Sequence, residues 1–235
     1  MVFSQVSASN QNYLKAVWTL GEWSDEAVTA TTVAAKVGVR LSTASDAIRR
    51  LAEQGYLTHA PYGAVALTEK GLTIALAMVR RHRLIEAFLV ETLGYRADQV
   101  HEEAEVLEHA VSDFMIERID AQLGRPERDP HGDPIPCADG SVPRLGALLL
   151  AEAARSASEG GALRVERIAD DDPDLVRFLA ERGIVYGAEA VLREAPPYSE
   201  AVALSLRGAQ EEVSFGMAAA RAVWVSMLDE RAPKR

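Results

Sequence analysis

The residues best suited to metal binding lie between His82 and His109, a stretch that holds three of the chain's five histidines. His82 and Glu86 are four positions apart and therefore share one face if the segment is helical. Farther along, four more side chains fall within an arc about 100° wide on a helix: His101, Glu105, Glu108 and His109. Imidazole nitrogens and carboxylate oxygens bind divalent transition metals, so two such helices packed together would form a metal site. The alternative is two solvated His/Glu pairs of the kind common on helix surfaces.

Two helices are expected to position these side chains. Apolar residues recur every three or four positions over 75–89 and again over 100–111, which is the period of an amphipathic helix. Gly94 lies between the two segments, and a helical hairpin is predicted there. The second helix is expected to continue over 112–123 and to end at the following glycine.

Length and composition indicate a chain with sizeable hydrophobic cores. At 235 residues, of which 48% are hydrophobic, the chain is long enough for two or three compact units. Its first ten residues lack the basic start and apolar core of a secretion signal, and no apolar run is long enough to cross a bilayer. We therefore expect a cytoplasmic protein. The single cysteine, Cys137, excludes an internal disulfide and a thiolate cluster.

The charge of the chain is unevenly distributed. The net charge is −10, yet residues 1–81 carry eight Lys and Arg against six Asp and Glu, a balance of +2. The remaining residues therefore carry −12. A basic N-terminal head on an acidic body is typical of a DNA-binding unit joined to a cation-binding unit.

The N-terminal part of the chain predicts a winged helix-turn-helix. Three amphipathic helices are expected, over 10–20, 29–38 and 41–54. Thr29 can cap the second helix, and Gly38 ends it. Residues 56–71 follow as two short strands joined by a turn at Pro61–Gly63.

The start of the third helix is expected to enter the major groove of DNA. Seven side chains there are able to reach base edges or phosphates: Arg40, Ser42, Thr43, Ser45, Asp46, Arg49 and Arg50. The alternative is that Ser42 only caps the helix and that Arg49 and Arg50 are solvated charges.

Two irregular segments follow the metal-ligand stretch. Residues 125–143 hold five prolines, which predicts a connector without regular structure. His131 within it is expected to be structural, because no second ligand stands at helical spacing from it. Residues 145–161 include the segment SASEGG and are expected to form a flexible linker.

The C-terminal segments predict a small β-barrel. Short strand-like stretches at close spacing begin at Ala162, and a helical segment over 217–227 is expected to close the domain. The acidic run at 170–174 either starts a capped helix, the commoner use of such residues, or supplies a metal ligand.

Three motifs connect these parts: HRLIEAFL at 82–89, VHEEAEVLEHAVSD at 100–113 and DPHGDPIP at 129–136. With the winged helix before them and the barrel after them, the chain resembles the diphtheria toxin repressor family of metal-dependent transcriptional regulators. The resemblance implies a mainly α fold with small β elements. Its expected parts are a winged helix-turn-helix over 1–72, a helical metal-binding and dimerisation domain over 73–144, a linker over 145–161 and an SH3-like (FeoA-type) β-barrel over 162–235.

The resemblance implies two metal sites per chain. The primary site, which switches DNA binding, would be formed by Asn12, Glu105, Glu108 and His109. The ancillary site would be formed by His82, Glu86 and His101 and completed from the barrel domain by Asp172, with Asp174 as the second choice.

Three positions bear on the metal. Iron-dependent members of the family carry Cys where this chain has Glu105, and manganese-dependent members carry Glu, so we expect Mn(II), with Fe(II) as the alternative. Asn12 stands where manganese regulators usually have Asp, and it can alternatively serve only as a helix cap. Lys15 stands where short manganese regulators have Glu, so that part of their geometry is not carried over.

The resemblance also implies partners. We expect a homodimer that binds a palindromic operator in double-stranded DNA and represses metal-uptake genes. Metal would tie the first helix to the trunk and so fix the spacing of the two heads. A metal-dependent hydrolase is the alternative from another class, because paired metals held by His and carboxylates also activate water. We expect neither an enzyme nor a membrane partner, since no general base or substrate pocket is recognisable.

Overall fold

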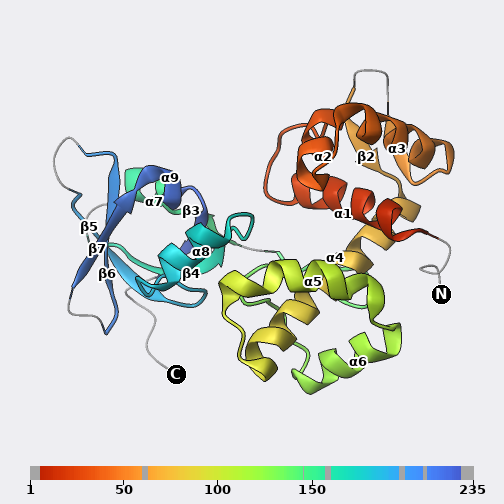
Figure 1. Cartoon of the computed structure of the whole chain (residues 1–235). Helices are drawn as coiled ribbons and strands as arrows, with labels where there is room; N and C mark the ends of the chain where they lie inside the picture. The colour runs from red at the N-terminus through yellow and green to blue at the C-terminus, as the bar shows by residue number, and fades with distance from the viewer. Residues whose placement is uncertain are drawn as a thin grey trace. The chain divides into compact units, whose positions relative to one another are not determined.

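The computed structural model describes residues 6–59, 63–144, 146–156, 160–195, 199–208 and 211–228. The chain divides into two compact units. Their helices and strands are drawn in Figure 1. The first contains the chain up to His82 together with Glu108–Val111 and Pro136–Val142, and the second contains Arg83–Leu107, Ser112–Ile135 and the chain from Pro143. The finer division at residues 72, 144 and 161 stays a prediction. Among the described helices, none has the length and apolar character needed to cross a membrane.

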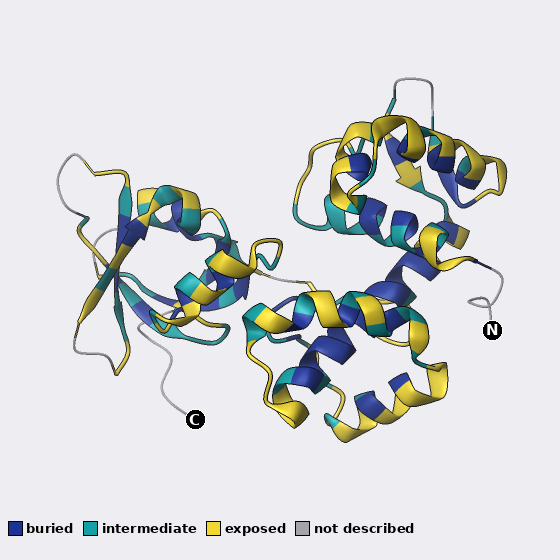
Figure 2. Ribbon diagram, in the orientation of Figure 1, coloured by how far each residue is buried: buried dark blue, intermediate teal, exposed yellow. Residues whose placement is uncertain are grey.

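The first unit begins with a winged helix-turn-helix, as predicted. Its elements are α1 (Ala8–Glu22), α2 (Ala30–Val37), α3 (Leu41–Glu53), β1 (Leu57–His59) and β2 (Val65–Leu67). The two strands pair antiparallel, with Leu57 opposite Leu67. Leu14, Val33 and Ile48, one from each helix, are fully buried in the shared core. Figure 2 colours the buried positions of these helices dark blue. The predicted turn at Pro61–Gly63 falls largely outside the described residues.

Short polar contacts set the ends of these helices. Thr29 caps α2 by accepting a hydrogen bond from the backbone N–H of Thr32 at 3.2 Å. Gly38 ends that helix with a φ of +72°, a left-handed conformation that glycine adopts without steric cost. The N-cap of α3 is Arg40, so Ser42 lies within the helix and is not its cap.

The middle of the chain consists of α4 (Glu69–Leu93), the short 3-10 helix η2 (Ala97–Gln99), α5 (Val100–Ala110) and α6 (Asp113–Gln122). The prediction that the α5 helix continues through residue 123 is wrong. Ser112 begins a new helix by accepting a hydrogen bond from the N–H of Met115 at 3.2 Å. A serine side chain competes with the backbone in this way, and therefore favours a helix start over a helix interior.

The second unit ends in a six-stranded antiparallel sheet with the order β3-β8-β4-β5-β6-β7. The strands are β3 (Leu148–Leu149), β4 (Ala162–Ile168), β5 (Glu189–Arg193), β6 (Ala201–Leu206), β7 (Glu212–Gly216) and β8 (Val223–Met227). Three short helices accompany them: α7 (Leu150–Ser156), α8 (Pro173–Ala180) and α9 (Met217–Ala220). Leu163, Val165 and Leu204 are fully buried in this core.

Two predictions for this region differ from the structure. The segment assigned to a flexible linker, 145–161, contains β3 and α7, and Leu150 of α7 is fully buried in the barrel core. Residues 157–159 of its SASEGG segment lie outside the described residues. The segment 217–227 is helical only over its first four residues, because buried Val223 and Val225 alternate with less buried neighbours, the pattern of a strand.

Candidate metal centre

The first group of candidate ligands lies in the first unit and consists of Asn12, Glu108 and His109. Asn12 projects from α1, and the other two come from the last turn of α5. Arg81 of α4 fixes this end of α5, because its Nε donates to the carbonyl oxygen of Glu108 at 2.9 Å. Glu108 is consequently held in a fully buried position.

Both ring nitrogens of His109 face amide oxygens. Nε2 lies 2.6 Å from Oδ1 of Asn12, and Nδ1 lies 3.0 Å from Oε1 of Gln11. The Gln11 amide is itself oriented, since its Nε2 donates to the carbonyl of Val6 at 3.0 Å. Because an amide oxygen only accepts, the contact with Gln11 requires Nδ1–H as the donor, which leaves Nε2 as the ring nitrogen available to a metal. A histidine oriented through its other nitrogen is the usual arrangement of a metal ligand.

The arrangement fits a divalent cation. Oε1 of Glu108 lies 3.5 Å from Nε2 of His109, so an imidazole, an amide oxygen and a carboxylate converge. Glu105, the remaining predicted primary ligand, lies one turn before His109 on α5 and is partly exposed.

Ser7 caps α1, so Asn12 does not serve as the cap. Gln11 could not be predicted from the sequence, because a residue that only orients a metal ligand stands at no characteristic distance from that ligand along the chain.

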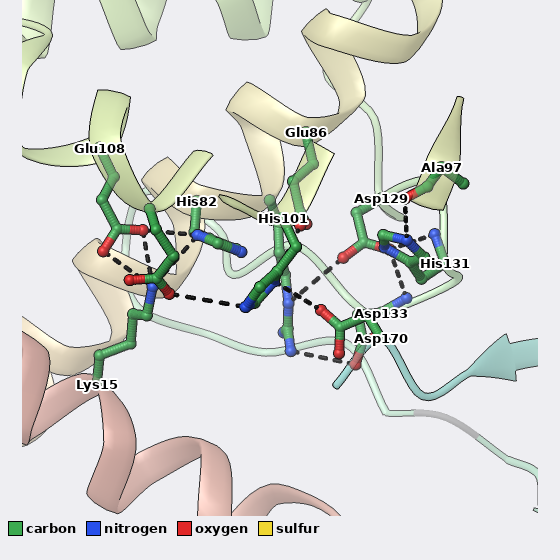
Figure 3. Close-up of polar contacts among 12 residues, drawn as sticks. Lys15, His82, Glu86, Ala97, His101, Glu108, Asp129, His131, Asp133 and Asp170 are labelled. Carbon is green, nitrogen blue, oxygen red and sulfur yellow. Dashed lines mark hydrogen bonds and ion pairs between the residues drawn. The ribbon is translucent and has the colours of Figure 1, made fainter. Parts of the chain in front are cut away.

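His82 and Lys15 lie beside the same carboxylate. Nδ1 of His82 is 2.6 Å from Oε2 of Glu108, and Nζ of Lys15 is 2.9 and 2.8 Å from its two oxygens (Figure 3). His82 was predicted as an ancillary ligand, together with Glu86 one turn later on α4. In the structure its Nδ1 is directed at Glu108.

The second group lies in the second unit and consists of Glu86, His101 and Asp170, each offering a ligand atom within 4.8 Å of the others. Nδ1 of His101 lies 3.5 Å from Oε1 of Glu86 and 3.3 Å from Oδ2 of Asp170. Burial lowers the pKa of His101, but the neighbouring Asp170 and Glu86 outweigh this effect and raise the pKa from 6.5 to about 10. The negative charge around this imidazole stabilises a cation here.

Asp170, and not Asp172, is the barrel-domain carboxylate beside His101. The Asp172 side chain instead caps α8 by accepting the N–H groups of Asp174 and Leu175 at 3.0 and 3.2 Å. Asp174 is paired with Arg177 at 2.6 Å on the surface. The acidic run therefore supplies the helix cap through its third residue, whereas its first residue lies beside His101.

A third group shares Glu86 and adds Asp129 and His131, all three buried and with ligand atoms within 4.8 Å. His131 Nε2 donates to the carbonyl of Ala97 at 3.0 Å, whereas its Nδ1 has no hydrogen-bond partner among the described residues. Burial, followed by the charges of Asp133 and Glu86, raises the pKa of Asp129 well above its usual value. The structural role predicted for His131 thus leaves out a buried ring nitrogen in a side chain that is grouped with Glu86 and Asp129; these residues are drawn in Figure 3.

The turn that carries these two residues is fastened to strand β4. Ile168 N–H donates to the carbonyl of His131 at 2.8 Å, and Nε of Arg167 donates to Oδ1 of Asp133 at 2.7 Å. Gly132 has a φ of +91°, and a Cβ there would lie 2.1 Å from the carbonyl oxygen of Glu166. Glycine is therefore required at this close approach.

Replacing Gly132 with alanine is expected to destabilise the second unit by roughly 3 kcal/mol or more, because backbone strain and overlap combine. Gly140→Ala is the matched control: the φ of Gly140 is +85°, but a Cβ there would meet only a Leu76 side-chain carbon, at 3.8 Å. It should lose only about 1 kcal/mol through its φ. Chemical denaturation measures the free energy of unfolding of both variants, and equal losses of stability would contradict the close contact between Gly132 and the Glu166 carbonyl.

The predicted DNA-contacting residues lie on one helix of the first unit. Six of the seven are exposed, from the N-cap of α3 to its last turn, and Ser45 is half-buried. Arg49 donates to Asp46 at 2.9 Å, an exposed pair that costs little to open on binding. The opposite side of α3, with Ala44, Ile48 and Leu51, is buried in the core.

Comparison with known proteins identifies the family. The profile of the iron-dependent repressor N-terminal DNA-binding domain matches residues 5–65, that of the iron-dependent repressor metal-binding and dimerisation domain matches 68–137, and that of the FeoA domain matches 155–227. The iron-dependent repressor IdeR of Mycobacterium leprae (strain TN) is 30% identical over 200 residues, which are 80% of this chain and 85% of IdeR. This chain belongs to the diphtheria toxin repressor family.

Solved members of the diphtheria toxin repressor family share the fold. A manganese-dependent transcriptional repressor in complex with manganese is 48% identical, with a TM-score of 0.85 over 93% of this chain and 100% of that one. The manganese regulator SloR is 30% identical, with a TM-score of 0.73 over 93% and 98%. Members of the family are metal-dependent transcriptional repressors and not enzymes, which removes the hydrolase alternative. The relatives include both iron-dependent and manganese-dependent proteins.

Proposed function

We propose that this chain is a manganese-responsive repressor whose DNA binding is switched by a metal at the first centre, which we define as Asn12, Glu105, Glu108 and His109. The observation that carries the proposal is the approach of α1 to α5, in which Oδ1 of Asn12 lies 2.6 Å from Nε2 of His109. Asn12 belongs to the same helix as the core residues Leu14 and Val17 of the winged helix. The first centre therefore connects a metal ligand set to the DNA-binding head.

The chemistry of the ligands favours manganese. The first centre offers one imidazole nitrogen and otherwise oxygen atoms, a set that suits Mn(II) and gives softer metals no thiolate. The chain's single cysteine, Cys137, is exposed and lies in the connector. Relatives that are manganese-dependent repressors support the same choice, and Fe(II) is the alternative metal.

The residues of the first centre would restrict the orientation of α1. A divalent cation bound here would be held by a neutral imidazole, a neutral amide oxygen and one carboxylate, and its charge would draw Asn12 of α1 toward Glu108 and His109 of α5. Asn12 then holds α1 against α5, and α3 moves with α1 because both pack into one core. The metal-bound protein is thereby biased toward the orientation that binds DNA.

A homodimer would present two such heads to a palindromic operator. The matched metal-binding and dimerisation domain supports this assembly. Three exposed apolar side chains on α5 and α6 offer a surface for it: Val106, Phe114 and Met115, at 71%, 72% and 45% exposure. Large apolar side chains gathered on a surface commonly mark an interface.

A second cation site is proposed from the second and third groups together. We define the second centre as Glu86, His101, Asp129, His131 and Asp170, with His82 adjoining Glu86 on α4. The buried Nδ1 of His131 and the three carboxylates support this proposal. Asp129 and His131 belong to the connector, which is hydrogen-bonded to the end of β4, and Asp170 follows β4 in the sequence. A cation here would therefore stabilise the attachment of the connector to the barrel.

The test is a DNA-shift assay on the DNA upstream of the chain's own gene. The metal-free protein, prepared with EDTA, should bind weakly, and added Mn(II) should strengthen binding, with Fe(II), Co(II) and Zn(II) compared at equal concentration. Stronger activation by Fe(II) than by Mn(II) would contradict the manganese proposal. Binding that ignores every metal would contradict the switch itself.

Asn12→Asp is expected to lower the Mn(II) midpoint of DNA binding by roughly tenfold, because it adds a negative charge to the first centre. Asn10→Asp is the matched control, since it adds the same charge two positions earlier on α1. The midpoint is measured by fluorescence anisotropy of labelled DNA. Equal shifts in the two variants would indicate a general effect of charge and would remove Asn12 from the ligand set.

A further inference from the structure

We propose that Lys15 acts as a tethered cation that occupies the carboxylate of the first centre when metal is absent, and so sets the metal concentration at which the repressor responds. This inference rests on the proposed function, because it concerns the same centre. It makes Lys15 a determinant of metal affinity although the ammonium group can never be a metal ligand.

Lys15 makes an unusually complete contact with Glu108. Its Nζ donates to Oε1 at 2.9 Å and to Oε2 at 2.8 Å, so both oxygens of the carboxylate are engaged (Figure 3). The same nitrogen lies 3.2 Å from Nδ1 of His82. The Glu108 side chain is fully buried and that of Lys15 is 13% exposed, so solvent screens the pair only weakly.

The position of Lys15 brings it into competition with metal. Lys15 follows Asn12 by three residues on α1, and the two therefore share one face of that helix. A divalent cation bound between Asn12 and His109 needs an oxygen of Glu108, which is already bonded to the ammonium group. Two cations at one carboxylate repel each other strongly when water is largely excluded. Metal binding must therefore release Lys15.

The lysine side chain is suited to this exchange. Its four-carbon stem is flexible, and its charged end can move to solvent while the stem stays packed. A buried carboxylate that lacks a counter-charge strongly destabilises a protein. Until it leaves, Lys15 supplies this counter-charge to Glu108. The metal-free form is consequently stabilised by Lys15, and the metal-bound form is not.

Lys15→Met tests the proposal, because methionine keeps the length of the side chain and removes its charge. We expect Mn(II) to bind the variant at least about tenfold more tightly by calorimetry. The melting temperature of the metal-free variant should fall, and saturating Mn(II) should largely restore the wild-type value. Lys36→Met, an exposed lysine of the same head, is the matched control and should change neither quantity.

A second measurement uses the wild-type protein and does not depend on how a variant folds. Lysine acetylation by a small reagent, followed by mass spectrometry, should modify Lys15 slowly in EDTA and faster with Mn(II), with Lys36 as the internal reference. Wild-type protein that binds no Mn(II) would overturn the proposed function. Wild-type protein that binds Mn(II), with unchanged Lys15 labelling or no tighter binding by Lys15→Met, would overturn the role of Lys15 alone.

Discussion

His109→Ala is expected to abolish manganese-dependent DNA binding while leaving the head folded. In the proposed first centre the ring would provide Nε2, and it is not part of the hydrophobic core, so its loss would remove a ligand without opening a core cavity. Residues that only orient a metal ligand typically cost 10–100-fold in affinity when mutated. We expect at least about 100-fold for His109 itself, and a loss within that lower range for Gln11→Ala. Mn(II) affinity and DNA affinity should fall together.

Glu103→Ala is the matched control for His109→Ala, because it removes an exposed polar side chain from the same helix. It should retain the Mn(II) response of the wild-type protein. An unchanged DNA-binding midpoint in His109→Ala would exclude this histidine from the switch. If Gln11→Ala proved as damaging as His109→Ala, the assigned division between ligand and orienting residue would be wrong.

Asp170→Asn and Asp172→Asn form the second decisive comparison. Asp170 faces His101 at 3.3 Å, whereas Asp172 is engaged in the cap of α8. We expect Asp170→Asn to remove one of two Mn(II) binding events in calorimetry, because the second centre loses a charged oxygen ligand. Asp172→Asn should keep both events, and asparagine can still cap the helix.

The same pair of variants separates two assignments of the barrel-domain ligand. Loss of a binding event in Asp172→Asn but not in Asp170→Asn would restore the assignment made from family resemblance. Two binding events in both variants would exclude the acidic run from metal binding. Either result would require a different carboxylate to complete the second centre.

The candidate ligands on helices could be predicted from the sequence because helix geometry fixes their relative positions. Spacing alone placed Glu86 one turn after His82, and His101, Glu105, Glu108 and His109 within one arc of a helix. The approach of Asn12 to His109, 97 positions apart, depends on tertiary packing, which no local pattern records. Only the resemblance to a family suggested that contact.

Loop residues were the hardest to assign. His131 and Asp129 stand two positions apart in an irregular turn, where helical spacing gives no information, and the motif DPHGDPIP was the only available signal. The choice between Asp170 and Asp172 was decided by the start of α8, which turns one carboxylate into a cap. Similarly, Ser112 ended a helix whose apolar period continued into α6.

The position of bound Mn(II) tests the central claim most directly. Crystals of the full chain grown with Mn(II) should give an anomalous difference peak at coordination distance from Oδ1 of Asn12, Nε2 of His109 and a carboxylate oxygen of Glu108. The Nζ of Lys15 should have left that carboxylate. A fully occupied manganese elsewhere, with Lys15 still bonded to Glu108 and no peak beside His109, would contradict the proposed metal switch.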